Sequence, residues 1–344
     1  MKLKVAQISE SAFSVQGHGV HTAFTETVRG LRASKKATVW ENSFQKSDIR
    51  HIHTVGPYSL FHLLLGSGKK VVSAHVVPES FIGSLIGAKY WLGFAKFYLR
   101  WFYNRAHVVI AVSDDTKANL EQLGVKKPIK VIYNMVDTSR YKFTKQDKKE
   151  ARKQLGIRDD AVVVIGNGQV QPRKRVDTFI NIAKKLPELK FIWVGGMPFG
   201  RVAADHEKMQ RLIDDAPGNV TFTGVVSLDE VQTCFSVGDI FVMSSEQETF
   251  GLAIVEAAAS GLPVVLRNIR DYDDTFRGDA IMCNESEFSK EVQKLSDSRD
   301  YYSQAKKRSA KIAKRFDSTT ITAQLLAVYE SSLGLHNDDI IENK

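Results

Sequence analysis

The chain of 344 residues, 43% of them hydrophobic, is long enough for two α/β domains that each bury a full core. Its 48 basic and 39 acidic residues give a net charge of +9, which favours an anionic partner such as nucleic acid, anionic lipid or a nucleotide sugar. Cys234 and Cys283 have no metal-ligand spacing, so zinc is excluded and a reducing compartment is expected.

The first half of the chain alternates strand-like with helical patterns, and residues 2–8 predict a strand rather than the apolar segment of a signal peptide. The segments of this half are residues 2–8, 22–32, 37–40, 49–53, 58–65, 70–75, 108–112, 115–123 and 129–133. Such alternation predicts a parallel sheet covered by helices.

Two glycines, Gly17 and Gly19, fall between the first strand and the first helix. Glycine there allows a tight turn and the close approach of a phosphate. Thr22 stands where a dinucleotide-binding fingerprint would have its third glycine, so an ordinary strand-to-helix turn is an equally good interpretation.

The apolar tract 81–103 is interrupted by lysines and an arginine and falls short of a membrane span, whereas residues 87–105 predict an amphipathic helix. One face of that helix carries Trp91, Phe94, Tyr98 and Trp101, and another carries Lys89, Lys96, Arg100 and Tyr103. An aromatic face beside a basic one is typical of a helix that lies on an anionic bilayer. The alternative is a core helix with a solvated basic side.

Residues 138–158 are polar and lysine-rich, and we expect a linker followed by the first helix of a second unit. The alternation then restarts at residues 161–165, 191–194, 220–223, 240–243 and 264–266. The predicted fold class is α/β, with Rossmann-like domains at residues 1–140 and 141–318. Their ligand should lie at the carboxyl ends of the strands that face the cleft between them.

The strand at residues 239–243 leads into a tight loop with Glu248, and the alanine-rich helix after it contains Glu256 and ends near Gly261. The backbone N–H groups of residues 250–252 have no intrahelical acceptor at the start of this helix, where the helix dipole is positive. The loop therefore predicts a site for a sugar phosphate. Taken alone, two glutamates at this spacing also fit an exposed helix that carries them for solubility.

The spacing of Glu248 and Glu256 resembles the Glu-x7-Glu motif of retaining glycosyltransferases of family 4, which have the GT-B fold of two Rossmann-like domains facing a cleft. The resemblance implies that Glu248 contacts sugar hydroxyls and that Glu256 binds the nucleotide ribose. It also implies that the backbone of residues 249–252 meets the diphosphate. Thr249 stands where the family usually has glycine.

Residues 168–174 resemble the Gly-Arg-x4-Lys segment of the same family, whose cations hold the donor diphosphate. Lys174 matches the family's lysine, and a positive charge there stabilises the diphosphate as it leaves. Gln169 replaces the usual arginine, so Arg173 or Arg175 is left to supply the second positive charge. A solvated basic loop is the alternative.

His75 ends the strand at residues 70–75, which resembles the family's Val-x-x-x-His segment. The resemblance implies that His75 lies near the reacting sugar, where it hydrogen-bonds the donor or orients the acceptor hydroxyl. A structural histidine is the alternative, and we expect His51 and His53 to pack in the core or at its rim. The tract 134–137 resembles the turn that closes the family's first domain, and the family's last helix implies that residues 319–334 return to that domain.

We therefore predict two sets of site residues, one that is catalytic and one that binds the donor. The catalytic residues are His75, Lys174 and Glu248, and the donor-binding residues are Gly17, Gly19, Gln169, Arg173, Lys174, Thr249, Phe250, Gly251, Leu252 and Glu256. We expect neither a cofactor nor a metal, and Asp271 and Asp273 stand in the wrong context for a metal site.

Residues 187–196 and 266–272 resemble the short bacterial diacylglycerol glycosyltransferases. This resemblance implies retaining transfer of a hexose from UDP-glucose or UDP-galactose to diacylglycerol or monoglycosyldiacylglycerol, by a cytoplasmic enzyme peripheral to the inner face of the cell membrane. The alternatives are a glycosyltransferase of polysaccharide or lipopolysaccharide assembly, a non-hydrolysing sugar-nucleotide epimerase and a non-catalytic sugar-nucleotide sensor. Nucleic acid is not an expected partner, because the basic residues are spread over both halves.

Overall fold

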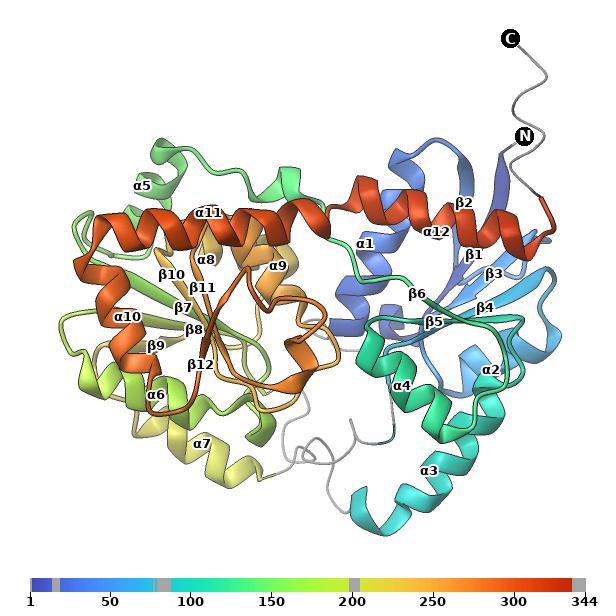
Figure 1. The fold of residues 1–344 in the computed structure, drawn as a ribbon, viewed down its shortest axis with the longest axis horizontal. Coiled ribbons are helices and arrows are strands. Elements are labelled where there is room, and N and C mark those ends of the chain that lie inside the picture. Colours follow the sequence, from blue (N-terminus) through green and yellow to red (C-terminus); the bar gives the residue numbers. More distant parts are fainter. Residues whose placement is uncertain (1, 14–18, 77, 79–87, 198–204, 336–344) are drawn as a thin grey trace.

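The computed structural model describes residues 2–13, 19–76, 78, 88–197 and 205–335. The strands of these residues form two six-stranded parallel sheets that lie side by side (Figure 1). This arrangement confirms the predicted α/β class with two Rossmann-like units.

The N-terminal sheet has the strand order β2-β1-β3-β4-β5-β6. Its strands are β1 (Leu3–Ile8), β2 (Ala37–Glu41), β3 (Ile49–Ile52), β4 (Lys69–Ala74), β5 (Val108–Ala111) and β6 (Ile129–Val131). The helices of this half are α1 (Gly19–Ala33), α2 (Pro57–Leu65), α3 (Ala88–Tyr103) and α4 (Asp114–Leu123). All four residues of β3 are buried, as expected for a parallel strand that helices cover on both faces.

The C-terminal sheet has the order β12-β11-β10-β7-β8-β9. Its strands are β7 (Val163–Asn167), β8 (Lys190–Val194), β9 (Val220–Phe222), β10 (Ile240–Met243), β11 (Val264–Arg267) and β12 (Ile281–Cys283). Its helices are α5 (Lys145–Gln154), α6 (Val176–Lys185), α7 (His206–Asp214), α8 (Leu228–Val237), α9 (Leu252–Ala259), α10 (Phe288–Asp297) and α11 (Arg299–Arg315). The edge strand β12 lies outside the segments that the sequence predicted.

An aromatic cluster fills the core beside β7 and β8. The ring of Phe179 on α6 packs edge-to-face against Trp193 at 5.2 Å and against Phe191 at 5.4 Å. Gly166 of β7 leaves the space that the indole occupies. Trp193 also donates a hydrogen bond of 2.9 Å to the carbonyl of Gly168, which fixes the loop that follows β7.

The chain crosses between the two halves twice, and the crossings are hydrogen-bonded to each other. Val136, after β6, donates to the carbonyl of Phe316 at 3.1 Å, and Ser318 donates to the carbonyl of Val136 at 2.9 Å. Past this point, α12 (Ser318–Ser332) runs alongside the N-terminal half next to α1, whereas α11 lies over the C-terminal half (Figure 1). The two halves are therefore joined by two short segments that are hydrogen-bonded to each other. Any motion of one half relative to the other must take place at these segments.

Helix α3 forms where the amphipathic pattern predicts it, but the direction of one side chain was wrong. Tyr103, expected on the basic face, is fully buried and donates a hydrogen bond of 2.6 Å to the carbonyl of Val76. Ala95, Leu99 and Phe102 share its buried arc, while Phe94 and Phe97 point to solvent. The helix therefore packs on the core and also exposes aromatic rings.

We predict that Gly166→Ala destabilises the protein by about 1–3 kcal/mol, the usual cost of overpacking a core. A Cβ atom at this position would lie 2.6 Å from the Trp193 ring and 2.9 Å from the Phe179 ring. The free energy of unfolding in urea measures the effect. Gly218→Ala is the matched control, because a Cβ there meets nothing within 4 Å, and equal stability of the two variants would contradict the packing described.

Candidate active site

A lysine and a glutamate form a buried ion pair where the chain leaves two adjacent strands, β7 and β10. Lys174 ends the short 3-10 helix Pro172–Lys174 after β7, and its ammonium hydrogen-bonds the Glu248 carboxylate in the loop after β10. The two side chains are only 11% and 7% exposed. Parallel strands bring their carboxyl ends to one edge of a sheet, which explains why residues 74 positions apart meet.

The charge of Glu248 is stabilised in this buried position. Burial alone would raise the pKa of its carboxyl, but Lys174 and then Arg173 outweigh this effect and hold the pKa below its usual range. Arg173 lies 3.8 Å from the carboxylate and donates a hydrogen bond of 3.2 Å to the carbonyl of Gln247. Glu248 is therefore charged at neutral pH, whereas burial lowers the pKa of the Lys174 ammonium and the charge of Glu248 opposes this shift.

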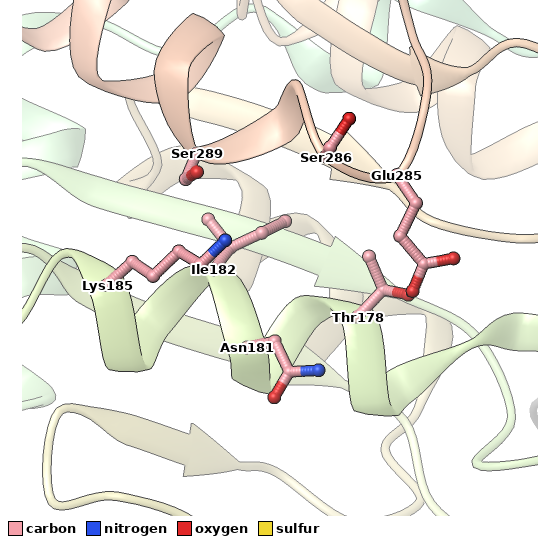
Figure 2. Close-up of a pocket in the computed structure, with 7 residues that line it drawn as sticks. All are labelled: Thr178, Asn181, Ile182, Lys185, Glu285, Ser286 and Ser289. Carbon is pink, nitrogen blue, oxygen red and sulfur yellow. The ribbon is translucent and has the colours of Figure 1, made fainter.

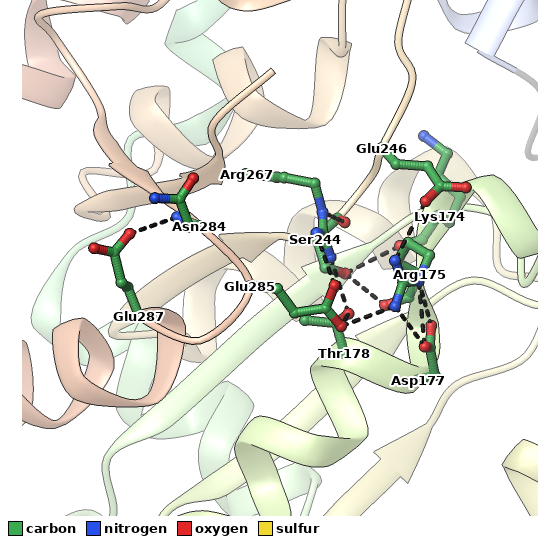
Figure 3. A network of polar contacts seen from close by, with 10 residues as sticks. All are labelled: Lys174, Arg175, Asp177, Thr178, Ser244, Glu246, Arg267, Asn284, Glu285 and Glu287. Carbon is green, nitrogen blue, oxygen red and sulfur yellow. Dashed lines mark hydrogen bonds and ion pairs between the residues drawn. The ribbon is translucent and has the colours of Figure 1, made fainter.

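Of the two arginines that could add a second positive charge, the structure places Arg173 beside Glu248. The guanidinium of Arg175 is paired with Asp177, Glu246 and Glu285 instead (Figure 3). Arg175 adopts the left-handed conformation, with φ of 50°, which costs a residue with a side chain about 1–2 kcal/mol. Its ion pairs offset that cost and tie the loop of Glu246 to the segment after β12.

Asp271 supports the loop from the other side, and the sequence did not single it out for this task. Its carboxylate accepts a hydrogen bond of 2.6 Å from the backbone N–H of Glu248. The backbone N–H of Glu246 donates to the carbonyl of Arg173 at 2.9 Å. These two bonds fix the direction in which Glu248 leaves the backbone, and only the fold brings the partners together.

The turn between Glu248 and α9 presents backbone donors. Within the described part of the chain, the N–H groups of Thr249, Phe250 and Gly251 have no hydrogen-bond acceptor. Gly251 caps α9 with φ of 86°, a conformation that glycine adopts readily, and Leu252 is the first residue of the helix. The buried ring of Phe250 packs against Phe276 and Phe316 and anchors the turn. An anion could bind these donors at the positive end of the helix dipole.

Glu256 lies in a different environment from Glu248. Its side chain is buried one turn into α9, and burial raises the pKa of its carboxyl to about 7. The negative charge of Glu26 contributes to this upward shift of the pKa, while the Tyr141 hydroxyl and Arg140 oppose it. Glu256 therefore exchanges a proton near neutrality, and its predicted contact with a ribose stays a prediction.

The remaining predicted residues are spread over both halves. His75 follows β4, is partly exposed and lies 3.2 Å from His53, measured from its Nε2 atom to Nδ1. His51 and His53 are buried, in line with the expected core packing. Gln169 accepts a hydrogen bond of 2.6 Å from Gln171, and Gly19 begins α1. Gly17 lies outside the described residues.

A separate cavity of about 360 Å³ lies between α6 and the start of α10 (Figure 2). It is lined by Thr178, Asn181, Ile182, Lys185, Glu285, Ser286 and Ser289. It shares Thr178 and Glu285 with the Arg175 network, but neither Lys174 nor Glu248 lines it. Among the residues that the structure describes, no group of three or more His, Cys, Asp or Glu side chains could hold a metal ion.

We predict that Lys174→Met costs about 3–5 kcal/mol of stability, because it removes the hydrogen-bonded partner of the buried Glu248 charge and leaves Arg173, 3.8 Å away, as the remaining cation. The double variant Lys174→Met/Glu248→Leu should recover most of this loss, since it removes both charges from the interior. Urea unfolding of the wild type, the two single variants and the double variant measures the coupling. Additive losses would show that the two side chains do not interact in the folded protein.

Two family models match the chain, and together they span most of it. The model described as "Glycosyl transferases group 1" matches residues 147–312, and the model described as "Glycosyltransferase Family 4" matches residues 11–140. The first therefore covers the half with the Lys174–Glu248 pair, and the second covers the half with His75.

Two similar curated proteins are bacterial enzymes. The chain is 33% identical over 283 residues to an alpha-galactosylglucosyldiacylglycerol synthase of Streptococcus pneumoniae, covering 80% of this chain and 75% of that protein. It is 29% identical over 313 residues to a processive diacylglycerol alpha-glucosyltransferase of Acholeplasma laidlawii, covering 85% and 88%.

Solved structures share the fold at low sequence identity. The Anabaena protein Alr3699/HepE, crystallised with UDP and glucose, superposes with a TM-score of 0.77 at 19% identity, covering 96% of this chain and all of that one. The sucrose-phosphate synthase of Thermosynechococcus elongatus has the same TM-score at 15% identity, covering 97% and 100%. Family and fold agree with what the sequence predicted: the chain is a glycosyltransferase with the GT-B fold and belongs to family 4.

Proposed function

We propose that this enzyme transfers a hexose from a UDP-sugar, UDP-glucose or UDP-galactose, to a membrane glycerolipid with retention of the anomeric configuration. The proposal rests on the buried Lys174–Glu248 pair, which lies beside the backbone donors of residues 249–251. The names of two similar proteins, a galactosylglucosyldiacylglycerol synthase and a diacylglycerol glucosyltransferase, support diacylglycerol or its monoglycosyl derivative as the acceptor.

The leaving diphosphate needs positive charge, and this site can supply it. Lys174 and Arg173 both lie beside Glu248 in the free enzyme, and the N–H groups of residues 249–251 directly follow Glu248 in the chain. A bound diphosphate would take these cations and N–H groups as partners, and Glu248 would then accept hydrogen bonds from sugar hydroxyls. The two cations would exchange Glu248 for the diphosphate, and the Glu248 carboxylate would keep hydrogen-bond partners in the sugar hydroxyls.

The protein cations provide the charge that a metal supplies in other transferases, so we propose that the reaction needs no metal ion. Closure of the two halves about the crossings at Val136 and Phe316 would exclude water and thereby limit hydrolysis of the donor. His75, on the facing half, is proposed to contact the reacting sugar or the acceptor hydroxyl.

We predict that Glu248→Ala reduces transfer at least hundredfold, roughly the loss expected when a transition-state contact is removed, while the protein stays folded. Purified protein is incubated with radiolabelled UDP-glucose or UDP-galactose and with diacylglycerol or its monoglycosyl derivative, and the lipids are separated by chromatography. Glu150→Ala, which removes an exposed glutamate of α5, is the matched control.

Unchanged turnover by the Glu248→Ala variant would refute the assignment of the donor site. Conversion of the donor without any acceptor would favour an epimerase. Transfer of the label only to a polysaccharide or lipopolysaccharide intermediate would show that the acceptor is not a glycerolipid.

We further propose that the enzyme binds the inner face of the cell membrane as a peripheral cytoplasmic protein. Phe94 and Phe97 of α3 are 71% and 69% exposed, and Lys96 and Arg100 of the same helix are exposed beside them. Helix α2 adds the exposed side chains of Leu64 and Leu65. Exposed aromatic rings next to basic groups suit an anionic bilayer surface. No helix in the described part of the chain is long and apolar enough to cross a membrane.

We predict that the double variant Phe94→Ser/Phe97→Ser binds anionic vesicles about tenfold more weakly or worse, because two large apolar side chains no longer leave water. Flotation with vesicles of phosphatidylglycerol and phosphatidylcholine measures the bound fraction. Leu155→Ser is the matched control, since Leu155 is an exposed apolar residue of the other half. Equal flotation of all three proteins would place the membrane contact elsewhere.

A further inference from the structure

A chain of polar side chains lies behind His75 and connects it to the last helix. Its members besides His75 are Gln7 of β1, His51 of β3, His53 after β3, Ser73 of β4 and Tyr329 of α12, and all of these are buried. Each contact is within hydrogen-bond distance: Gln7 to Tyr329 at 3.0 Å, Tyr329 to His51 at 2.7 Å, His51 to Ser73 at 2.7 Å, Gln7 to His53 at 2.7 Å and His53 to His75 at 3.2 Å.

The amide of Gln7 fixes the direction of the hydrogen bonds that lead through Tyr329 to His51. Its Nε2 group donates to the Tyr329 hydroxyl. Among the described contacts of this hydroxyl, Nδ1 of His51 is the one atom that can take its proton, so the hydroxyl donates to Nδ1. Burial lowers the pKa of His51 to about 3, so the ring is neutral and carries one proton. That proton is on Nε2, which donates to the hydroxyl of Ser73.

The amide of Gln7 also fixes the direction of the hydrogen bonds that lead through His53 to His75. The Oε1 atom of Gln7 can only accept, so Nε2 of His53 carries the proton and donates to it. Burial also holds the pKa of His53 well below its usual range, so its Nδ1 atom has no proton and accepts. The partner of that Nδ1 atom is Nε2 of His75, which must therefore be the donor. His75 is then protonated on Nε2, and in the neutral ring its Nδ1 atom is a hydrogen-bond acceptor.

Gln7 decides the direction because a side-chain amide has one end that donates and one end that accepts. If the amide turned over, every proton in the chain would reverse, and the proton of His75 would move from Nε2 to Nδ1. The Tyr329 hydroxyl holds the amide in place from a helix 322 residues further along the sequence. The rings of His53 and His75 are stacked 5.5 Å apart, with an angle of 15° between their planes, which limits their rotation.

We propose that Gln7 and Tyr329 are positioning residues that hold His75 in the tautomer with an unprotonated Nδ1 atom, the form that accepts a hydrogen bond from a sugar or acceptor hydroxyl. This inference rests on the proposed function, in which His75 contacts the substrate. It assigns part of the active site to the final helix, although that helix follows the C-terminal half in sequence.

The test reads the tautomer of His75 directly. Nitrogen NMR of histidine-labelled protein, assigned with His75→Gln, distinguishes a protonated from an unprotonated ring nitrogen. We expect Nε2 protonation in the wild type and a mixture of tautomers in both Tyr329→Phe and Gln7→Met. In both variants kcat should fall about tenfold and KM for the UDP-sugar should stay the same, because the ring is less well oriented for proton transfer.

Tyr302→Phe is the matched control, since it removes the hydroxyl of a partly buried tyrosine, one that donates to the carbonyl of Asp239 at 3.0 Å in the other half. It should keep the wild-type tautomer and kcat. Protonation of Nδ1 in the wild type, or an unchanged tautomer in both network variants, would overturn the proposal. The spectra need no substrate, so a failure of the proposed lipid transfer leaves this outcome readable and separate.

Discussion

The active half of this molecule depends on two opposite charges that the fold removes from water together. Lys174 and Glu248 each come from a loop, and desolvating either charge alone would cost several kcal/mol. Pairing offsets that cost and fixes the two loops to each other at the edge of the sheet. The neighbouring Arg175 network adds the segment after β12 to the same assembly. In the mechanism that we propose, a donor molecule meets loops that are already in place, and its diphosphate replaces Glu248 as the partner of the cations.

The N-terminal half has buried polar side chains whose hydrogen bonds are satisfied in a different way. His51 and His53 are buried without a carboxylate partner among their hydrogen bonds, and they stay neutral. Neutral imidazoles can be buried at modest cost when both ring nitrogens are bonded, as they are here. In the mechanism that we propose, the C-terminal half supplies fixed charge, and the N-terminal half supplies the His75 ring with a defined direction of hydrogen bonding.

The sequence predicted what local pattern and motif can encode. Strands buried on both faces read as apolar runs, and the loop after β10 was recognised from Glu248, Phe250 and Gly251. The three-residue strand β12 was missed, whereas β6 and β9, which are equally short, lie within longer runs that the sequence predicted. Tyr103 was placed on the wrong face because periodicity gives relative angles along a helix but not which arc meets the core. The partners of Glu248 and Tyr329 depend on tertiary contacts, so no local pattern contains them.

The bond between Gln7 and Tyr329 also has a consequence for biosynthesis. Residue 329 is synthesised 322 residues after residue 7, so at ordinary elongation rates roughly 16 to 64 s pass between them. During that interval the nascent N-terminal sheet has no α12 to cover it, and the polar groups of Gln7 and His51 have no tyrosine partner. The half that is synthesised first is therefore completed only after α12 has been made.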